Sequence, residues 1–299
     1  MKKILYFCVA VMALGLCGSC NEQKEIVPTS DSTLLRVGVL PTVDCLPFYY
    51  ADSMGIFKSL GLQVELVTFS AAMDADTAFQ RGWIDGVASD LVKACIWQDA
   101  GDSVGVAMVS NLRLWLVTSP GARLLKEESL KEKIVGVTRN SAVDYFSDKI
   151  LEGVKLQSIN LNRAQINDLR LRMLMVDQNQ YDGAILPEPY ASETVARGAK
   201  RLRGTENFGT ENLMCVLFRD SIFKACKTDI NRFRQGYDSA VVRMNADSTS
   251  SVLGYLPREH QLDMPDSLFT YVPMKASISF HDSMLVDVRK WAKSRHLIK

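Results

Sequence analysis

Histidine is scarce in this sequence, and the cysteines beyond Cys20 lack the spacing that metal sites need. The chain of 299 residues has three histidines and seven cysteines. Beyond Cys20 the cysteines are scattered, with no C-x-x-C spacing and no histidine nearby; they are Cys45, Cys95, Cys215 and Cys226. This pattern argues against a zinc site. The four thiols are either buried singly, which we favour, or include one disulfide formed in an oxidising compartment.

A marked excess of either charge is also lacking. Lys and Arg number 35 against 34 Asp and Glu, and no basic stripe stands out. Nucleic acid is therefore not an expected partner. Apolar residues make up 47% of the chain, which is ample for two cores. The length suits two lobes at the usual size of about 100–200 residues per domain. We expect no cofactor and no metal.

The N-terminus carries an apolar run that is too short to cross a bilayer comfortably but suits the core of a signal peptide, and two lysines precede it. A glycine and a serine directly before Cys20 resemble a lipobox, the bacterial signal for cleavage before a cysteine and lipid attachment to its sulfur. We expect residues 1–19 to be a lipoprotein signal peptide and residues 20–32 a polar tether. The alternative is an ordinary secretory signal with an incidental cysteine.

Apolar runs alternate with helical patterns in the first part of the chain. The expected elements are strand 34–40, helix 46–60, strand 64–69, helix 73–81, strand 86–89 and helix 90–100. Two more apolar runs follow, at 104–109 and 114–118. Alternation at this spacing predicts βαβ units and a parallel sheet.

A second unit repeats this plan. Its expected elements are strand 133–137, helix 141–151, a strand near 166–169, helix 171–178, strand 183–186 and helix 190–197. The polar stretch 119–132 is the expected first crossing between lobes. A strand at 212–218 returns the chain to the first lobe, and the part from 222 onward is mostly helical by period. The predicted division is 33–119 for the first part of lobe 1, 120–211 for lobe 2, and 212–299 for the return to lobe 1.

Polar residues follow several of these strands directly. The segments DGVASD (85–90) and YDGAILPEPY (181–190) each place an acidic tip after a turn and a short apolar run. In open parallel sheets the ligand lies beyond the carboxyl ends of the strands, so such tips are candidates for a cleft between two lobes. The candidate ligand-binding residues are Thr42, Asp44, Ser70, Ser89, Asp90, Arg139, Asn140, Ser141, Glu188 and Tyr190.

Several candidates have a purely structural alternative. Asp90 and Ser141 are good helix N-caps, and capping alone would explain them. The prolines around Glu188 either hold its carboxylate toward a ligand or only end a strand. Arg139, before a helix N-terminus, either holds an anionic group or is solvated. Aromatic residues that could stack on a ligand or simply pack in the core are Tyr49, Tyr50, Trp115 and Tyr190.

Residues 34–90 resemble the first lobe of the ABC-transporter substrate-binding proteins of the nitrate, sulfonate, taurine and thiamine-pyrimidine-precursor group. The marks are the LRVG strand, the proline loop, the YYA helix leading to GIFK, the GLQVEL strand and the GWIDG turn. SLKEKIVGV (129–137) is similar to the strand that opens the family's second lobe, with Glu132 where glycine is usual. YDGA and EP near 181–189 resemble a later strand and tip. The resemblance covers about 34–202.

The resemblance implies an α/β fold of the periplasmic-binding-protein type II, with two lobes. Each lobe is a mainly parallel sheet flanked by helices, and the ligand cleft lies between them. It implies a monomer that closes about a two-stranded hinge on a small-molecule ligand and passes it to ABC permease and ATPase subunits. A lipid on Cys20 would hold the protein to a membrane in the bacterial cell envelope, at the outer face of the inner membrane or in the periplasm.

The acidic tips indicate the class of ligand. Asp44, Asp90 and Glu188 stand against one cation, Arg139, which favours a ligand with amino or ring N–H donors, such as a thiamine-pyrimidine precursor, over a bare anion. Sulfonate, taurine or nitrate binding is the alternative. Related enzymes that make the thiamine pyrimidine need a histidine in the cleft and a cysteine-rich cluster. This chain has neither pattern, so we expect no enzyme. A ligand sensor without transport remains a further alternative.

Overall fold

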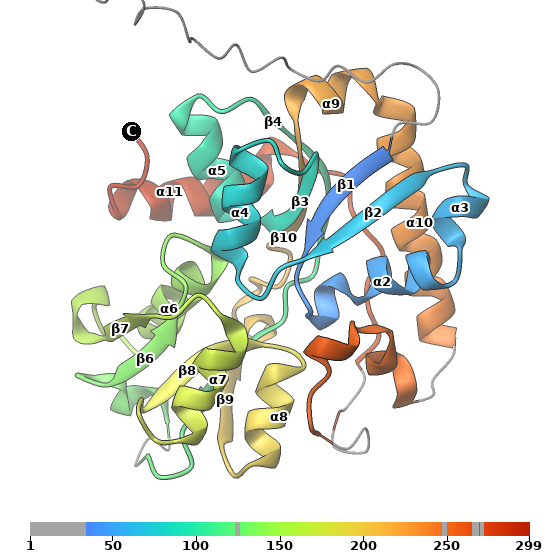
Figure 1. Cartoon of the computed structure of the whole chain (residues 1–299). Coiled ribbons are helices and arrows are strands. Elements are labelled where there is room, and N and C mark those ends of the chain that lie inside the picture. Colours follow the sequence, from blue (N-terminus) through green and yellow to red (C-terminus); the bar gives the residue numbers. More distant parts are fainter. Residues whose placement is uncertain (1–33, 123–125, 247–249, 265–268, 270–271) are drawn as a thin grey trace, which may run out of the picture.

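The computed structural model describes residues 34–122, 126–246, 250–264, 269 and 272–299. Two five-stranded sheets flanked by helices form two lobes (Figure 1), which confirms the expected α/β fold. The predicted signal peptide, the lipid site Cys20 and the tether lie outside the described residues. Among the described residues, no helix is long and apolar enough to cross a membrane.

The first lobe is built on a sheet with the strand order β2-β1-β3-β10-β4. β1 pairs in parallel with β2 and β3, whereas β10 runs antiparallel to β3 and β4. Four of its strands therefore share one direction, as the mainly parallel prediction requires. The strands are β1 (Leu34–Val39), β2 (Gln63–Thr68), β3 (Gly86–Asp90), β4 (Val104–Ser110) and β10 (Met214–Arg219).

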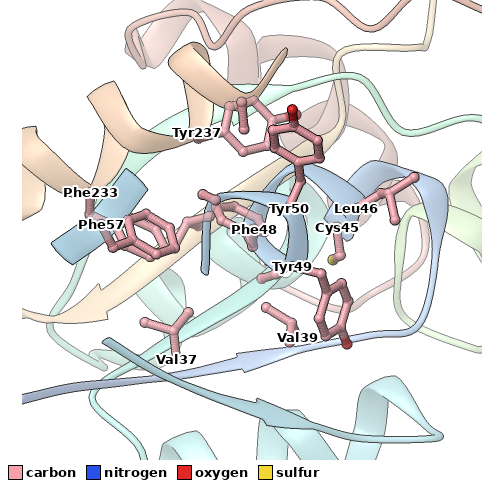
Figure 2. Packing of buried hydrophobic residues seen from close by; sticks show 14 of the residues in the cluster. Val37, Val39, Cys45, Leu46, Phe48, Tyr49, Tyr50, Phe57, Phe233 and Tyr237 are labelled. Carbon is pink, nitrogen blue, oxygen red and sulfur yellow. The ribbon is translucent and has the colours of Figure 1, made fainter. Parts of the chain in front are cut away.

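Helices cover both faces of this sheet (Figure 1). The expected helix 46–60 is broken into α2 (Leu46–Ser53) and α3 (Ile56–Ser59), because Gly55 adopts a left-handed φ of 64°. The rings of Phe48 and Phe57 each stack on Phe233, with centroids 5.2 Å apart, and so join these helices to α10 (Figure 2). The other helices of the lobe are α4 (Ala72–Gln80), α5 (Leu91–Ala100), α9 (Asp220–Ala225), α10 (Lys227–Ala246) and α11 (Val286–Ser294).

The second lobe repeats the arrangement with the strand order β7-β6-β8-β5-β9. Here β5 is the strand that runs antiparallel to its neighbours. The strands are β5 (Leu114–Thr118), β6 (Ile134–Val137), β7 (Asn162–Gln165), β8 (Gly183–Pro187) and β9 (Lys200–Gly204). The helices are α6 (Ala142–Gly153), α7 (Leu169–Asp177) and α8 (Tyr190–Ala196).

Two expectations for this lobe were wrong. The strand expected near 166–169 lies at 162–165, and its apolar continuation instead begins α7, which Asp168 caps by accepting a hydrogen bond from the backbone N–H of Leu171 at 2.7 Å. β9 was not expected, since its sequence KRLRG is too basic to predict a strand. It forms an edge strand beside β5, where its charged side chains reach solvent.

The first crossing between lobes also differs from the predicted position at 119–132. β4 belongs to the first sheet and β5 already to the second, so the chain crosses at residues 111–113. The return crossing runs beside it: the backbone N–H of Leu112 donates to the carbonyl of Glu211 at 2.5 Å, and the hydroxyl of Thr205 donates to the carbonyl of Leu112 at 2.9 Å. Two adjacent segments thus form the hinge.

The C-terminal part is less helical than expected. Between α10 and α11 the described helical segments are short 3-10 turns, at η5 (Ser250–Tyr255), η6 (Arg258–His260) and η8 (Asp282–Leu285). This part contacts both lobes, since Leu256 packs in the first-lobe core and Leu262 against the second-lobe core. The four cysteines beyond Cys20 are buried and form no disulfide with one another, as we favoured from the sequence.

A buried polar cluster joins α11 to the second lobe. The indole N–H of Trp291 donates to the Asp148 carboxylate of α6 at 2.8 Å, and Tyr145 meets the same indole edge-on with ring centroids 5.4 Å apart. The guanidinium groups of Arg163 and Arg295 lie 2.5 and 3.4 Å from Asp148. The contact between the lobes therefore extends well beyond the hinge.

Replacing Trp291 with Phe should lower the free energy of unfolding by about 1–2 kcal/mol, because the buried carboxylate of Asp148 loses one of its donors. Urea unfolding followed by far-ultraviolet circular dichroism measures the change. Trp83, which is 60% exposed, gives the matched control, and its replacement with Phe should stay within about 0.5 kcal/mol of the parent. Equal effects at the two positions would contradict the structural role of the Trp291 hydrogen bond.

Candidate functional site

A cavity of about 70 Å³ lies between the two lobes, at the carboxyl ends of their parallel strands. Both lobes line it, and two leucines of the hinge region, Leu112 and Leu114, complete it. The first lobe contributes Leu40, Thr42, Asp44, Cys45, Ala72, Asp76, Ala88, Ser89, Asp90 and Lys93. The second contributes Thr138, Ser141, Ala142, Val143, Asn167, Leu169, Arg172 and Pro187.

Three aspartates give the first-lobe wall an acidic character. Asp44 follows β1 in a single 3-10 turn, and Asp90 ends β3. Asp90 also caps α5, accepting a hydrogen bond from the backbone N–H of Lys93 at 3.0 Å. The ammonium group of Lys93 lies 3.2 Å from the carboxylate of Asp76, so that aspartate has a cation of its own. Asp44 and Asp90 have no ion pair among the described residues.

The second-lobe wall is formed by the start of α6 and by a buried arginine. Ser141 caps α6, accepting from the N–H of Val143 at 3.2 Å and donating to the carbonyl of Thr138 at 2.7 Å. Arg172 has no exposed surface. Its guanidinium donates to the carbonyls of Ile166 and Ile185 and to the hydroxyl of Thr138, which are neutral groups.

Burial shifts the ionisation of these groups. It raises the pKa of Asp44 to about 6, against a lowering influence from its own backbone N–H. It raises the pKa of Asp90 to about 6 as well, against the backbone amides of Lys93 and Ala142. It lowers the pKa of Arg172 to about 9, which leaves this side chain charged at neutral pH. The cavity therefore holds two carboxylates whose negative charge is only partly compensated.

Five of the ten predicted residues line this cavity: Thr42, Asp44, Ser89, Asp90 and Ser141. Glu188 lines a smaller neighbouring cavity of about 20 Å³, whose wall it shares with Asp44. Its carboxylate lies 2.7 Å from Arg201 and accepts the backbone N–H of Ser192 at 3.0 Å. These contacts give Glu188 a structural role in addition to its place beside the site.

The other four predicted residues lie away from the cavity. Ser70 is exposed, and its carbonyl accepts the N–H of Leu169 from the opposite lobe. Arg139 and Asn140 are exposed; Asn140 has a left-handed φ of 54°, and the Arg139 guanidinium turns away to the carbonyl of Arg163. Tyr190 is buried in the core of the second lobe.

The aromatic residues that could have stacked on a ligand serve other contacts. The hydroxyl of Tyr49 lies 3.0 Å from that of Thr68, and Tyr50 meets Tyr255 edge-on. The guanidinium carbon of Arg201 lies over the ring of Trp115, 4.3 Å from its centroid. None of these three aromatic side chains lines the cavity.

Sequence reasoning missed Asp76, Lys93, Thr138, Asn167 and Arg172. Lys93 and Asp76 lie on helices and face the cavity. A single charged residue in a helical sequence does not reveal whether its side chain points toward a site or toward solvent. Thr138 directly follows β6, whose end was predicted correctly, so the rule that selected Ser89 applies to it as well. Asn167 follows β7, and the same rule would have found it had the end of β7 been placed correctly. Arg172 is accommodated at Gly136, where an added Cβ would lie 3.0 Å from its side chain.

Comparisons with known proteins agree with this architecture. Residues 29–150 match the model of the NMT1-like family. A segment of 60 residues is 35% identical to the nitrate import ATP-binding protein NrtC of Synechococcus elongatus. That match spans 20% of this chain and 9% of the relative, so the chain covers a small part of that protein's length.

Solved structures resemble most of the chain at low identity. The alkanesulfonate-binding protein SsuA from Xanthomonas axonopodis pv. citri, bound to MOPS, has a TM-score of 0.77 and 15% identity, over 91% of this chain and 96% of that one. The periplasmic nitrate-binding protein NrtA from Synechocystis PCC 6803 has a TM-score of 0.67 and 13% identity, over 84% and 74%. The desulfurization enzyme DszB has a TM-score of 0.63 and 12% identity, over 89% and 93%. The chain therefore has the fold of the periplasmic binding proteins, and its residues 29–150 are similar to the NMT1-like family.

Proposed function

We propose that this protein is the substrate-binding component of an ABC importer and that it captures a small molecule by closing its lobes. The observation that carries the proposal is the cavity itself, whose walls come from both lobes and whose polar groups lie at the carboxyl ends of the strands. A ligand there touches both walls, so binding and closure are one event. Permease and ATPase subunits, and a lipid on Cys20 that holds a monomer in the cell envelope, complete the proposal.

Binding is favoured over catalysis by the composition of the walls. The three histidines are His260, His281 and His296, and none lines the cavity. General acid–base chemistry with histidine, and pyrimidine synthesis from a histidine of the chain itself, would both need one there. The similarity to DszB is limited to the fold. One fold can occur in proteins with unrelated functions.

The charges in the cavity favour a ligand with N–H donors. With Lys93 paired to Asp76, the carboxylates of Asp44 and Asp90 remain to accept hydrogen bonds. An amino-substituted heteroaromatic ring, such as a thiamine-pyrimidine precursor, offers such donors on a flat body that suits a small closed space. We therefore favour this class of ligand.

A sulfonate or nitrate ligand is the second candidate, and two observations favour it. Arg172 is a buried cation beside the cavity, and the start of α6 faces the same space. The solved structures with similar folds include binding proteins for alkanesulfonate and nitrate.

A thermal-shift screen of the purified protein against aminopyrimidines, amines, taurine, simple sulfonates and nitrate decides between the classes. Ligand at a hundred times its Kd should add about 2.7 kcal/mol and raise Tm by several degrees. We expect the shift with aminopyrimidines or amines. Replacing Asp44 with Asn should abolish most of it, whereas the exposed Asp74→Asn, on α4, should leave it intact. A shift with sulfonate or nitrate instead would contradict the favoured ligand class.

The affinity for an N–H donor ligand should rise with pH through about 6. Protons compete with the ligand for Asp44 and Asp90, and this competition ends as both carboxyls ionise above their raised pKa. Displacing one proton lowers the Kd by about tenfold from pH 5 to pH 7. Calorimetry across this range, corrected for the ionisation of the free ligand, measures the slope. An affinity that falls as pH rises would show that these carboxyls bind the ligand as acids.

A further inference from the structure

The N-termini of two helices from different lobes meet at one carboxylate. Asp90 caps α5 of the first lobe through the backbone N–H of Lys93. The same carboxylate interacts with the backbone amide of Ala142, the first residue of α6 in the second lobe. The two helices are in contact, and residues at the start of each line the cavity.

The start of α6 has the properties of an anion-binding position. A helix of 12 residues presents a partial positive charge and free N–H groups at its first turn. Two of these groups are already used: Asp90 interacts with the amide of Ala142, and Ser141 accepts the N–H of Val143. Just before the helix, Asp144 accepts the N–H of Asn140. A carboxylate of the protein therefore occupies the place that a ligand oxyanion would take.

A second negative group at this point would be repelled as well as left without donors. The negative charge of Asp76 opposes the ionisation of Asp90, and the neighbouring cation, Lys93, lies in an ion pair with Asp76. An incoming sulfonate would have to displace Asp90 from both helices. A ligand N–H group, in contrast, would find the carboxylate held in place to accept its hydrogen bond.

We propose that Asp90 is the residue that sets the ligand class, acting as an internal anion that excludes oxyanions from the start of α6 and selects a ligand with N–H donors. This inference rests on the proposed function, since it concerns the ligand of the same cavity. It predicts a specificity different from that named for the alkanesulfonate- and nitrate-binding structures with similar folds.

Helix capping can be separated from ligand selection, because serine and asparagine also cap helices. Asp90→Ser and Asp90→Asn keep the cap of α5 and remove the charge. The matched control is Asp74→Asn, which also removes a negative charge from the first turn of a helix, but at an exposed side chain that does not line the cavity. Circular dichroism confirms that each variant is folded before binding is measured.

The experiment is isothermal titration of the full chain and the three variants with two probes, methanesulfonate and 4-amino-2-methylpyrimidine. Removing the charge of Asp90 should increase the affinity for methanesulfonate by at least about tenfold and reduce that for the aminopyrimidine by a similar factor. The Asp74→Asn variant should behave as the parent with both probes.

The two arms test different statements. The methanesulfonate arm decides the inference: a gain in both Asp90 variants supports it, and equal binding by the parent and these variants overturns it. The aminopyrimidine arm decides the proposed ligand class. A parent that binds neither probe, with variants that gain methanesulfonate, would keep Asp90 as the excluding residue and reject the aminopyrimidine proposal.

Discussion

The two lobes are joined by two crossings of the chain, and the first strand after each crossing runs antiparallel to its neighbours in the sheet that it enters. The position of both lobes follows from this arrangement. β5 enters the second sheet directly after β4 leaves the first, and β10 returns to the first sheet, so each lobe has an antiparallel strand next to the crossing segments. Leu112, in the first crossing segment, donates its backbone N–H to Glu211 of the return segment and packs against the cores of both lobes. This hinge places the carboxyl ends of the two sets of parallel strands opposite each other.

The polar groups that line the cavity follow from this arrangement of the lobes. Strand ends deliver Asp90 and Thr138, helix starts deliver Ser141, and burial between the lobes raises the cost of each unpaired charge. The carboxylates of Asp44 and Asp90 are buried without an ion pair among the described residues, so hydrogen-bond donors from a ligand would stabilise them. In the proposed function, ligand binding contributes hydrogen bonds that the lobes alone do not make. The Trp291 cluster and the C-terminal segment hold the lobes together from outside the cavity.

Much of this could be predicted from the sequence, because strand periodicity and turn residues are local signals. The two βαβ units, Asp44 and Asp90 follow from such patterns. The crossing at 111–113 could not be predicted, since no Pro or Gly marks it and only pairing with β8 assigns β5 to the second sheet. Arg139 was predicted in the site and lies outside it, whereas Arg172 was not predicted and lines the cavity. Side-chain direction depends on tertiary packing, and the sequence LRLRMLMVD does not reveal which of its arginines is buried.

A ligand that joins both walls of the cavity should slow amide exchange in both lobes, which hydrogen exchange read by mass spectrometry measures. With a saturating ligand from the screen, we expect slower exchange in two segments from different lobes, 88–93 and 138–143, in the same experiment. Protection confined to one lobe, or located at another surface while both segments exchange as in the free protein, would contradict it.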